Sequence, residues 1–276
     1  MNHDKSELEI SVRLWTDDVK DFTSQAMLTR FKIGWWILNR IMELLNSIDK
    51  IEKCDTLELM SRMPDEVIDL IVTDPPYLIN YKTNRRKGNH KFSETIPNDD
   101  NPELMKQYIK ECHRVLKNDT AMYMFCSFDK IDFFKSEIEK YFTVKNIIIW
   151  RKNNHTAGDL EAQFGKQYEM IILANKGRRP FNGDRLTDVW DFKRVSSDKL
   201  LHQNQKPIEL IKRCIIKHSN VGDVVFDGFM GSGTTALAAL ELDRHFIGTE
   251  IDEYYFGVAE ERIKNHNAQL SLFDEV

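Results

Sequence analysis

A carboxylate, two prolines and an aromatic ring stand together in the stretch V-T-D-P-P-Y-L at positions 72–78. The stretch continues a largely apolar run at 67–72, which is typical of a buried strand. Pro75 and Pro76 fix two backbone φ angles and remove two amide donors, so the strand must end there in a stiff projection. Because open α/β sheets bind ligands beyond the carboxyl ends of their strands, Asp74 and Tyr77 are expected to face a ligand crevice.

The groups of this projection suit a nucleobase. An exocyclic amino group offers two N–H donors, which Asp74 and a neighbouring carbonyl oxygen can accept while the base stacks on the ring of Tyr77. The plain alternative is that the two prolines only terminate the strand and that the tyrosine beside them is incidental.

A second candidate site is the glycine-rich turn in V-V-F-D-G-F-M-G-S-G-T-T-A-L at positions 224–237. Gly231 and Gly233 allow a ligand to approach the backbone closely, and the helix amides that begin at Thr234 point toward an anionic group. No lysine follows the last glycine, so the turn is not a phosphate-binding loop of the G-x-x-x-x-G-K-[ST] kind. It predicts a nucleotide-type ligand, or else a tight turn without a ligand.

An acidic residue ends the next predicted strand, in H-F-I-G-T-E-I-D at positions 245–252. Glu250 lies where a carboxylate at the edge of such a sheet binds ribose hydroxyls. The alternative is that Glu250 caps a helix at the surface, a part that Asp252 would also suit.

The elements that position these residues alternate between strand-like and helix-like patterns from about residue 51 onward. This alternation predicts an α/β fold, a Rossmann-like, doubly wound and mostly parallel seven-stranded sheet. Asn101 and Pro102 predict the start of one helix, and Pro207 that of another. The seven strands are expected at 51–54, 67–73, 121–126, 144–150, 168–174, 224–226 and 245–249.

The motifs and their order resemble those of the DNA amino-methyltransferases in the β arrangement, in which the catalytic motif precedes the S-adenosylmethionine motif. D-P-P-Y at 74–77 matches the catalytic motif, and F-D-G-F-M-G-S-G-T-T at 226–235 matches the cofactor loop, except that Gly228 replaces a proline. H-Q-N-Q-K-P-I-E-L at 202–210 and K-C-D-T-L-E-L-M at 53–60 resemble two further segments of that family. The resemblance spans about 51–266, with this permuted order of motifs.

The resemblance implies a set of site residues. The catalytic residues would be Asp74, Pro75, Pro76 and Tyr77. S-adenosylmethionine would be the cofactor, with Asp55 at its adenine. The cofactor-binding residues would be Asp55, Asp227, Gly231, Ser232, Gly233, Thr234, Glu250 and Lys206.

The chemistry that this implies is the activation of a poor nucleophile. The lone pair of the adenine amino nitrogen is delocalised into the ring, whereas a sulfonium is an excellent methyl donor. Acceptance of both N–H groups, by Asp74 and the Pro75 carbonyl, would make the nitrogen pyramidal and aim its lone pair at the methyl group. The base would be flipped out of the duplex and stacked on Tyr77.

A basic stretch follows the catalytic motif, L-I-N-Y-K-T-N-R-R-K-G-N-H-K-F at 78–92. On a chain with a formal net charge of −5, this local excess predicts contacts with DNA phosphates, or else a solvated loop. Target recognition is expected from segments near 80–100, 151–166 and 177–200 jointly. The predicted DNA-binding residues are Lys82, Arg85, Arg86 and Lys87.

The remaining expectations concern organisation and partners. Residues 1–50 carry a helical pattern without strand signals, which predicts an N-terminal helical extension to a 51–276 catalytic domain. The four cysteines stand apart without a C-x-x-C pair, so no metal site is predicted. The acidic start and the lack of a long apolar run favour a cytoplasmic protein with no membrane contact. DNA is the expected partner, and a cognate restriction endonuclease and a second copy of the chain are considered as others.

The leading interpretation is an adenine-specific DNA methyltransferase, because Asp74 stands where serine is commoner in the cytosine enzymes of the family. A cytosine-N4 DNA methyltransferase has the same geometry and remains an alternative. A nicotinamide-dependent dehydrogenase would use the same glycine turn and Glu250. A non-catalytic DNA-binding relative is a further alternative, kept open by Gly228.

Overall fold

The computed structural model describes residues 38–79, 97–155, 159–196, 201 and 205–274. The chain divides into two compact units, Met1–Glu43 and Leu44–Val276. The first unit contributes the start of a helix over 38–47. The second unit contains the sheet, the boundary lying a few residues before the predicted one at residue 50.

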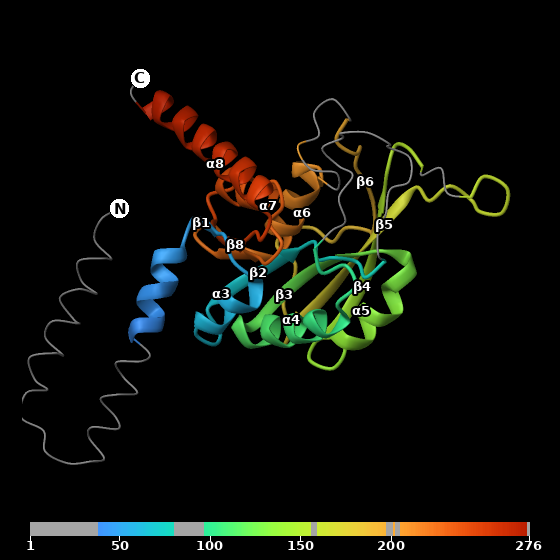
Figure 1. Cartoon of the computed structure of the whole chain (residues 1–276), viewed down its shortest axis with the longest axis horizontal. Helices are drawn as coiled ribbons and strands as arrows, with labels where there is room; N and C mark the ends of the chain where they lie inside the picture. Colours follow the sequence, from blue (N-terminus) through green and yellow to red (C-terminus); the bar gives the residue numbers. More distant parts are fainter. Residues whose placement is uncertain (1–37, 80–96, 156–158, 197–200, 202–204, 275–276) are drawn as a thin grey trace, which may run out of the picture. The chain divides into compact units, whose positions relative to one another are not determined.

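The second unit is built on an eight-stranded sheet with the order β1-β8-β7-β2-β3-β5-β4-β6 (Figure 1). β5 runs antiparallel to both of its neighbours, β3 and β4, and the other pairings are parallel. The sheet is therefore mostly parallel, as predicted. The strands are β1 (Lys50–Glu52), β2 (Ile68–Thr73), β3 (Leu116–Cys126), β4 (Thr143–Arg151), β5 (Tyr168–Lys176), β6 (Val189–Asp191), β7 (Val224–Asp227) and β8 (His245–Thr249).

The count of seven strands was wrong by one, because the edge strand β6 was missed. β6 has three residues, of which only Trp190 is buried, and among the described strands it pairs with β4 alone. So short a strand has neither the apolar run nor the alternation that identifies a strand in a sequence. It lies within the 177–200 segment that was assigned to target recognition.

Helices cover both faces of the sheet, and each face has its own core. In β3, Tyr123 and Phe125 belong to one apolar cluster, whereas Met122 and Met124 belong to the other. Strands that are buried on both faces are apolar at every position, which is why they appear in the sequence as continuous runs. One face carries α3 (Thr56–Arg62), α4 (Pro102–Val115) and α5 (Ile131–Ile138), and the other carries α6 (Ile208–His218), α7 (Thr234–Leu240) and α8 (Glu253–Asp274).

The two helix starts predicted at prolines are confirmed. The Asn101 side chain accepts a hydrogen bond from the Leu104 amide at 3.1 Å, and Pro102 occupies the first turn of α4. Pro207 is the N-cap of α6. In both cases proline occupies a position whose amide would have no partner within the helix.

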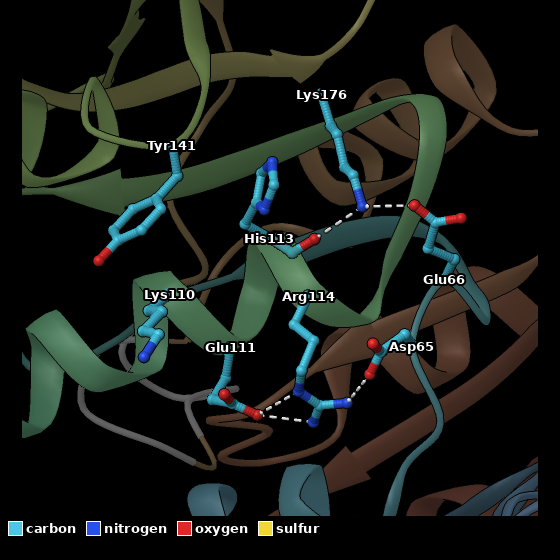
Figure 2. A pocket seen from close by; sticks show the side chains of 8 residues that line it. All are labelled: Asp65, Glu66, Lys110, Glu111, His113, Arg114, Tyr141 and Lys176. Carbon is cyan, nitrogen blue, oxygen red and sulfur yellow. Dashed lines mark hydrogen bonds and ion pairs between the residues drawn. The ribbon is translucent and has the colours of Figure 1, made fainter. Parts of the chain in front are cut away.

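A pocket lined by charged residues lies where β2 and β3 begin (Figure 2). Asp74 lies at the opposite end of these strands, just after β2. Lys176 at the end of β5 is buried and donates hydrogen bonds to the carbonyl oxygens of His113 and Leu116 and to Glu66. Arg114 similarly donates to the Met63 carbonyl at 2.9 Å. Both cations bind carbonyl groups at helix ends and nearby carboxylates. The charged residues of this pocket therefore stabilise the fold, and no ligand is needed to explain them.

None of the helices in the described ranges is long and apolar enough to cross a membrane.

Candidate active site

The pairing of β2 with β7 brings together two motifs that lie far apart in the sequence. The two strands run parallel, with Leu70 opposite Val225 and Ile71 opposite Phe226. Their carboxyl ends therefore lie side by side, so Asp74 just beyond β2 neighbours Asp227 at the end of β7. Parallel sheets bind ligands at the carboxyl ends of their strands.

The D-P-P-Y segment folds so that its two polar side chains meet. Pro75 and Pro76 are buried, while Asp74 and Tyr77 are partly exposed. The Tyr77 hydroxyl donates a hydrogen bond to Asp74 Oδ1 at 2.6 Å. The two prolines thus anchor the turn, and the carboxylate and the ring are presented at the end of the strand.

Lys206 is the counter-ion of Asp74. Its Nζ lies 2.6 Å from Asp74 Oδ2 and 3.2 Å from Glu169 Oε2, and its side chain is only 6% exposed. Burial acts to lower the pKa of Lys206, but the carboxylates of Asp74 and Glu169 outweigh it and raise that pKa, so the ammonium stays charged. Lys206 was assigned to the cofactor, whereas the structure places it beside the catalytic motif; the cofactor role stays a prediction.

Two carboxylates in this cluster experience opposite pKa shifts. Burial raises the pKa of Asp74, although Lys206 opposes the shift. Burial also acts to raise the pKa of Glu169, but Lys206 and Lys152 together bring it down to about 2. Glu169 is therefore firmly ionised at neutral pH, and Asp74 is the more basic carboxylate of the two.

The cofactor loop begins with a buried carboxylate that holds the turn. Asp227 Oδ1 accepts a hydrogen bond from the Phe229 amide at 3.0 Å, and Oδ2 accepts one from the Thr235 hydroxyl at 2.7 Å. Burial raises the pKa of Asp227 to about 7, against these hydrogen bonds. Asp227 thus ties the start of the loop to the first turn of α7.

The glycines of the loop have the backbone geometry for which glycine is needed. Gly231 and Gly233 have φ angles of 55° and 79°. A Cβ at Gly233 would lie 3.0 Å from the Cβ of Ala259 on α8, so the turn also packs tightly against that helix. Both positions of the turn therefore favour glycine.

Glu250 directly follows β8 and lies beside this loop. Its Oε2 accepts a hydrogen bond from the Gly231 amide at 2.7 Å, and Oε1 accepts one from the Asp252 amide at 2.8 Å. Burial raises the pKa of Glu250. The carboxylate is thus held in a fixed orientation next to the glycine turn, where ribose hydroxyls can donate to its remaining lone pairs.

Arg262 on α8 is a residue of this site that the sequence did not reveal. Its guanidinium donates hydrogen bonds to the carbonyl oxygen of Ser232 and, at 3.2 Å, to the Ser232 hydroxyl. The contact fixes the middle of the cofactor loop from a helix 30 residues further along the chain. An arginine in an exposed-looking helix gives no sequence signal of such a contact.

Asp55 and Gly228 complete the cofactor side. Asp55 is the N-cap of α3 and accepts a hydrogen bond from the Leu57 amide at 2.8 Å. A Cβ at Gly228 would lie 2.4 Å from Thr56 Oγ1 and 2.7 Å from Tyr108 Cε2. Thr56 and Tyr108 therefore fill the space that a proline would need, which gives a steric reason for glycine at this position.

The donors and acceptors of the loop fit S-adenosylmethionine. Glu250 and Asp55 supply acceptors for hydroxyl and amino groups, and Glu250 lies against the glycine turn. The Thr56 hydroxyl, next to Asp55, is buried and lacks a hydrogen-bond partner within the described part of the chain. The predicted DNA-binding residues Lys82, Arg85, Arg86 and Lys87 lie outside the described residues.

No group of three or more potential metal ligands occurs among the described residues.

Comparisons with known proteins give the family. A family model described as DNA methylase matches residues 68–261. The chain is 32% identical over 242 residues to DNA adenine methyltransferase YhdJ of Escherichia coli K12, covering 76% of this chain and 80% of the relative. The chain therefore belongs to the DNA methylase family, and S-adenosylmethionine is its methyl donor.

Solved structures share this fold. The M1.HpyAVI–SAM complex is 27% identical with a TM-score of 0.60, over 78% of this chain and 98% of that one. The PvuII DNA methyltransferase, described as cytosine-N4-specific, has a TM-score of 0.63 at 17% identity, over 78% of this chain and 90% of its own. At that identity the likeness concerns the fold alone.

Proposed function

We propose that this DNA methyltransferase transfers the methyl group to the exocyclic amine of adenine, with Asp74 as the principal acceptor for the amine. The observation that carries the proposal is the position of Asp74: a basic carboxylate at the end of β2, beside the cofactor loop that ends β7. Two features favour adenine over cytosine, namely aspartate at position 74 and the likeness to an adenine methyltransferase.

Asp74 has the capacity to accept the amine even with its present partners. Each of its oxygens already accepts one hydrogen bond, from Tyr77 and from Lys206. An ionised carboxylate has about four lone-pair sites, so two of them remain for a substrate N–H. The Pro75 carbonyl is the proposed second acceptor, and together the two would hold the nitrogen lone pair toward the methyl group.

S-adenosylmethionine, when bound, supplies a methyl group on a sulfonium that needs no further activation. The protein has to hold the amine, exclude water and accept a proton. After the transfer the nitrogen is cationic and acidic, and Asp74 or solvent takes the proton from it. Tyr77 is the proposed stacking platform for the flipped base, with its ring held by the hydrogen bond to Asp74.

Loading of the cofactor is assigned to the loop residues Asp227, Gly231, Ser232, Gly233 and Thr234, with Glu250 at the ribose and Asp55 at the adenine. DNA phosphates are assigned to Lys82, Arg85, Arg86 and Lys87. A restriction endonuclease partner, a homodimer and a cytoplasmic location, in reach of DNA, stay predictions. Family membership argues against a dehydrogenase, and the packing around Gly228 accounts for the departure that left a non-catalytic relative open.

The test is to incubate the full chain with S-adenosylmethionine and unmodified duplex DNA, digest the DNA to nucleosides and identify the products by mass spectrometry. N6-methyladenine is the expected product. N4-methylcytosine in its place would establish the alternative, which the same arrangement of acceptors permits. DNA without either product would contradict both assignments.

A further inference from the structure

Glu169 contributes a second carboxylate to the cluster around Asp74. It is the second residue of β5, and its Oε2 lies 3.3 Å from the Tyr77 hydroxyl oxygen. Its Oε1 pairs with Nζ of Lys152, which follows the end of β4. The antiparallel strands β4 and β5 thus deliver an acid–base pair to the catalytic motif on β2.

Four charged groups of the described residues depend on one another in this cluster. Two carboxylates, Asp74 and Glu169, face two ammonium groups, Lys206 and Lys152. The most buried of the four is Lys206, which both carboxylates share. A buried cation needs such compensation, because removal of one partner leaves a charge without its counter-ion.

We propose that Glu169 is a positioning residue for methyl transfer: anchored by Lys152, it shares Lys206 with Asp74 and so keeps the Asp74 carboxylate in place as an acceptor of the target amine. This inference rests on the proposed role of Asp74. Glu169 acts on the reaction only through Lys206 and Tyr77, and no contact of Glu169 with the substrate is invoked.

The physical reason is the division of Lys206 between two carboxylates. If Glu169 were neutral, it would no longer draw Lys206 away from Asp74, and Asp74 would become a less basic and less available acceptor. If Lys206 were absent, burial and the charge of Glu169 would favour protonated Asp74, which donates a hydrogen bond instead of accepting one. Within the described ranges, the other titratable groups near Asp74 are Tyr77, Cys126 and Asp227.

These two cases shift the pH dependence in opposite directions. The transfer rate should fall as the pH drops through the pKa of Asp74, because the ionised form is the acceptor. This fall at low pH is the acid limb of the pH–rate profile. Glu169→Gln removes a neighbouring negative charge, so this acid limb should move to lower pH by about one unit, and the plateau rate should fall roughly 10- to 100-fold. Lys206→Met should move the limb to higher pH.

The measurement is the single-turnover rate of methyl transfer to duplex DNA across pH, for the full chain with saturating cofactor. Glu66→Gln is the matched control, because Glu66 also pairs with a buried lysine, Lys176, but at the opposite edge of the sheet. It should leave the limb unmoved. Asp74→Asn should have a low rate without an acid limb, which assigns the limb to Asp74. Thermal unfolding and cofactor affinity report whether each variant is folded.

Several results separate this inference from the proposed function. If Glu169→Gln is folded and its limb and plateau match those of Glu66→Gln, Glu169 has no positioning role. If Glu169→Gln does not fold, Lys152→Met is used in its place. Without Lys152, Glu169 should attract Lys206 away from Asp74, so the acid limb should move to higher pH. An acid limb that does not move in Lys152→Met would overturn the inference. If the wild-type chain transfers no methyl group, or Asp74→Asn keeps full activity, the proposed function itself fails.

Discussion

Lys206 Nζ lies 2.6 Å from Asp74 Oδ2, although 132 positions separate the two residues in the sequence. The contact joins the segment before α6 to the end of β2. Because Lys206 is buried and Asp74 is partly exposed, the lysine supports the carboxylate from within the protein.

Lys206→Met should lower the rate of methyl transfer by at least about 10-fold at neutral pH, because Asp74 loses the cation that keeps it ionised. Cofactor affinity should change little, since Lys206 contacts the catalytic motif. Calorimetry with S-adenosylmethionine and single-turnover kinetics separate the two effects. A large loss of affinity with an unchanged rate would restore the assignment of Lys206 to the cofactor.

Tyr77 allows the ring and the hydroxyl to be tested separately. Tyr77→Phe keeps the ring but loses the hydrogen bond to Asp74, so it should retain part of the activity. Tyr77→Ala also loses the stacking surface, which contributes about 1 to 3 kcal/mol per base in nucleic-acid complexes, and should be the slower enzyme. Single-turnover rates of both variants on one duplex give the comparison, and equal losses would argue against stacking.

The carboxylates of Glu250 and Asp55 should contribute to the binding of S-adenosylmethionine. Glu250→Ala and Asp55→Ala are each expected to weaken S-adenosylmethionine binding by about 1 to 3 kcal/mol, through lost hydrogen bonds to ribose and adenine. Asp252→Asn is a suitable control, because Asp252 caps the start of α8 and its amide alone contacts Glu250. Unchanged affinity in both alanine variants, measured by calorimetry, would move the cofactor site elsewhere.

Arg262 should also affect the binding of S-adenosylmethionine, although it is not assigned a contact with the cofactor. Arg262→Ala removes the donors that hold Ser232, so the cofactor loop becomes less ordered before binding and affinity should fall by about 1 kcal/mol. Lys264→Ala, an exposed change on the same helix, should leave affinity as in the wild type. Equal affinities for the two variants would show that Arg262 has no role in ordering the loop.

Features that depend on neighbouring residues could be predicted from the sequence. Features that depend on contacts between distant segments could not. The strand ends that carry Asp74 and Glu250 follow from apolar runs, and their common edge follows from parallel pairing. The reversed direction of β5 and the short edge strand β6 have no signature in periodicity. Glu169 did leave one signal, since it is a charged residue directly before the apolar run at 170–174.

The partners of the site residues could not be predicted because they come together only through the tertiary fold. Lys152, Glu169 and Lys206 come from three segments that meet only after β4 and β5 have joined the sheet beside β3. Arg262 reaches the cofactor loop because α8 packs beside α7. Both are arrangements of whole elements, which short motifs do not specify.

The central claim is that Asp74 acts on the target amine and not on the cofactor, and Asp74→Ala tests it most directly. Methyl incorporation into duplex DNA under single-turnover conditions should fall by roughly 10²- to 10³-fold or more, while S-adenosylmethionine binds with nearly wild-type affinity. Asp65→Ala, which removes an exposed carboxylate at the opposite edge of the sheet, should retain its activity. Near-wild-type methyl transfer by Asp74→Ala would contradict the account.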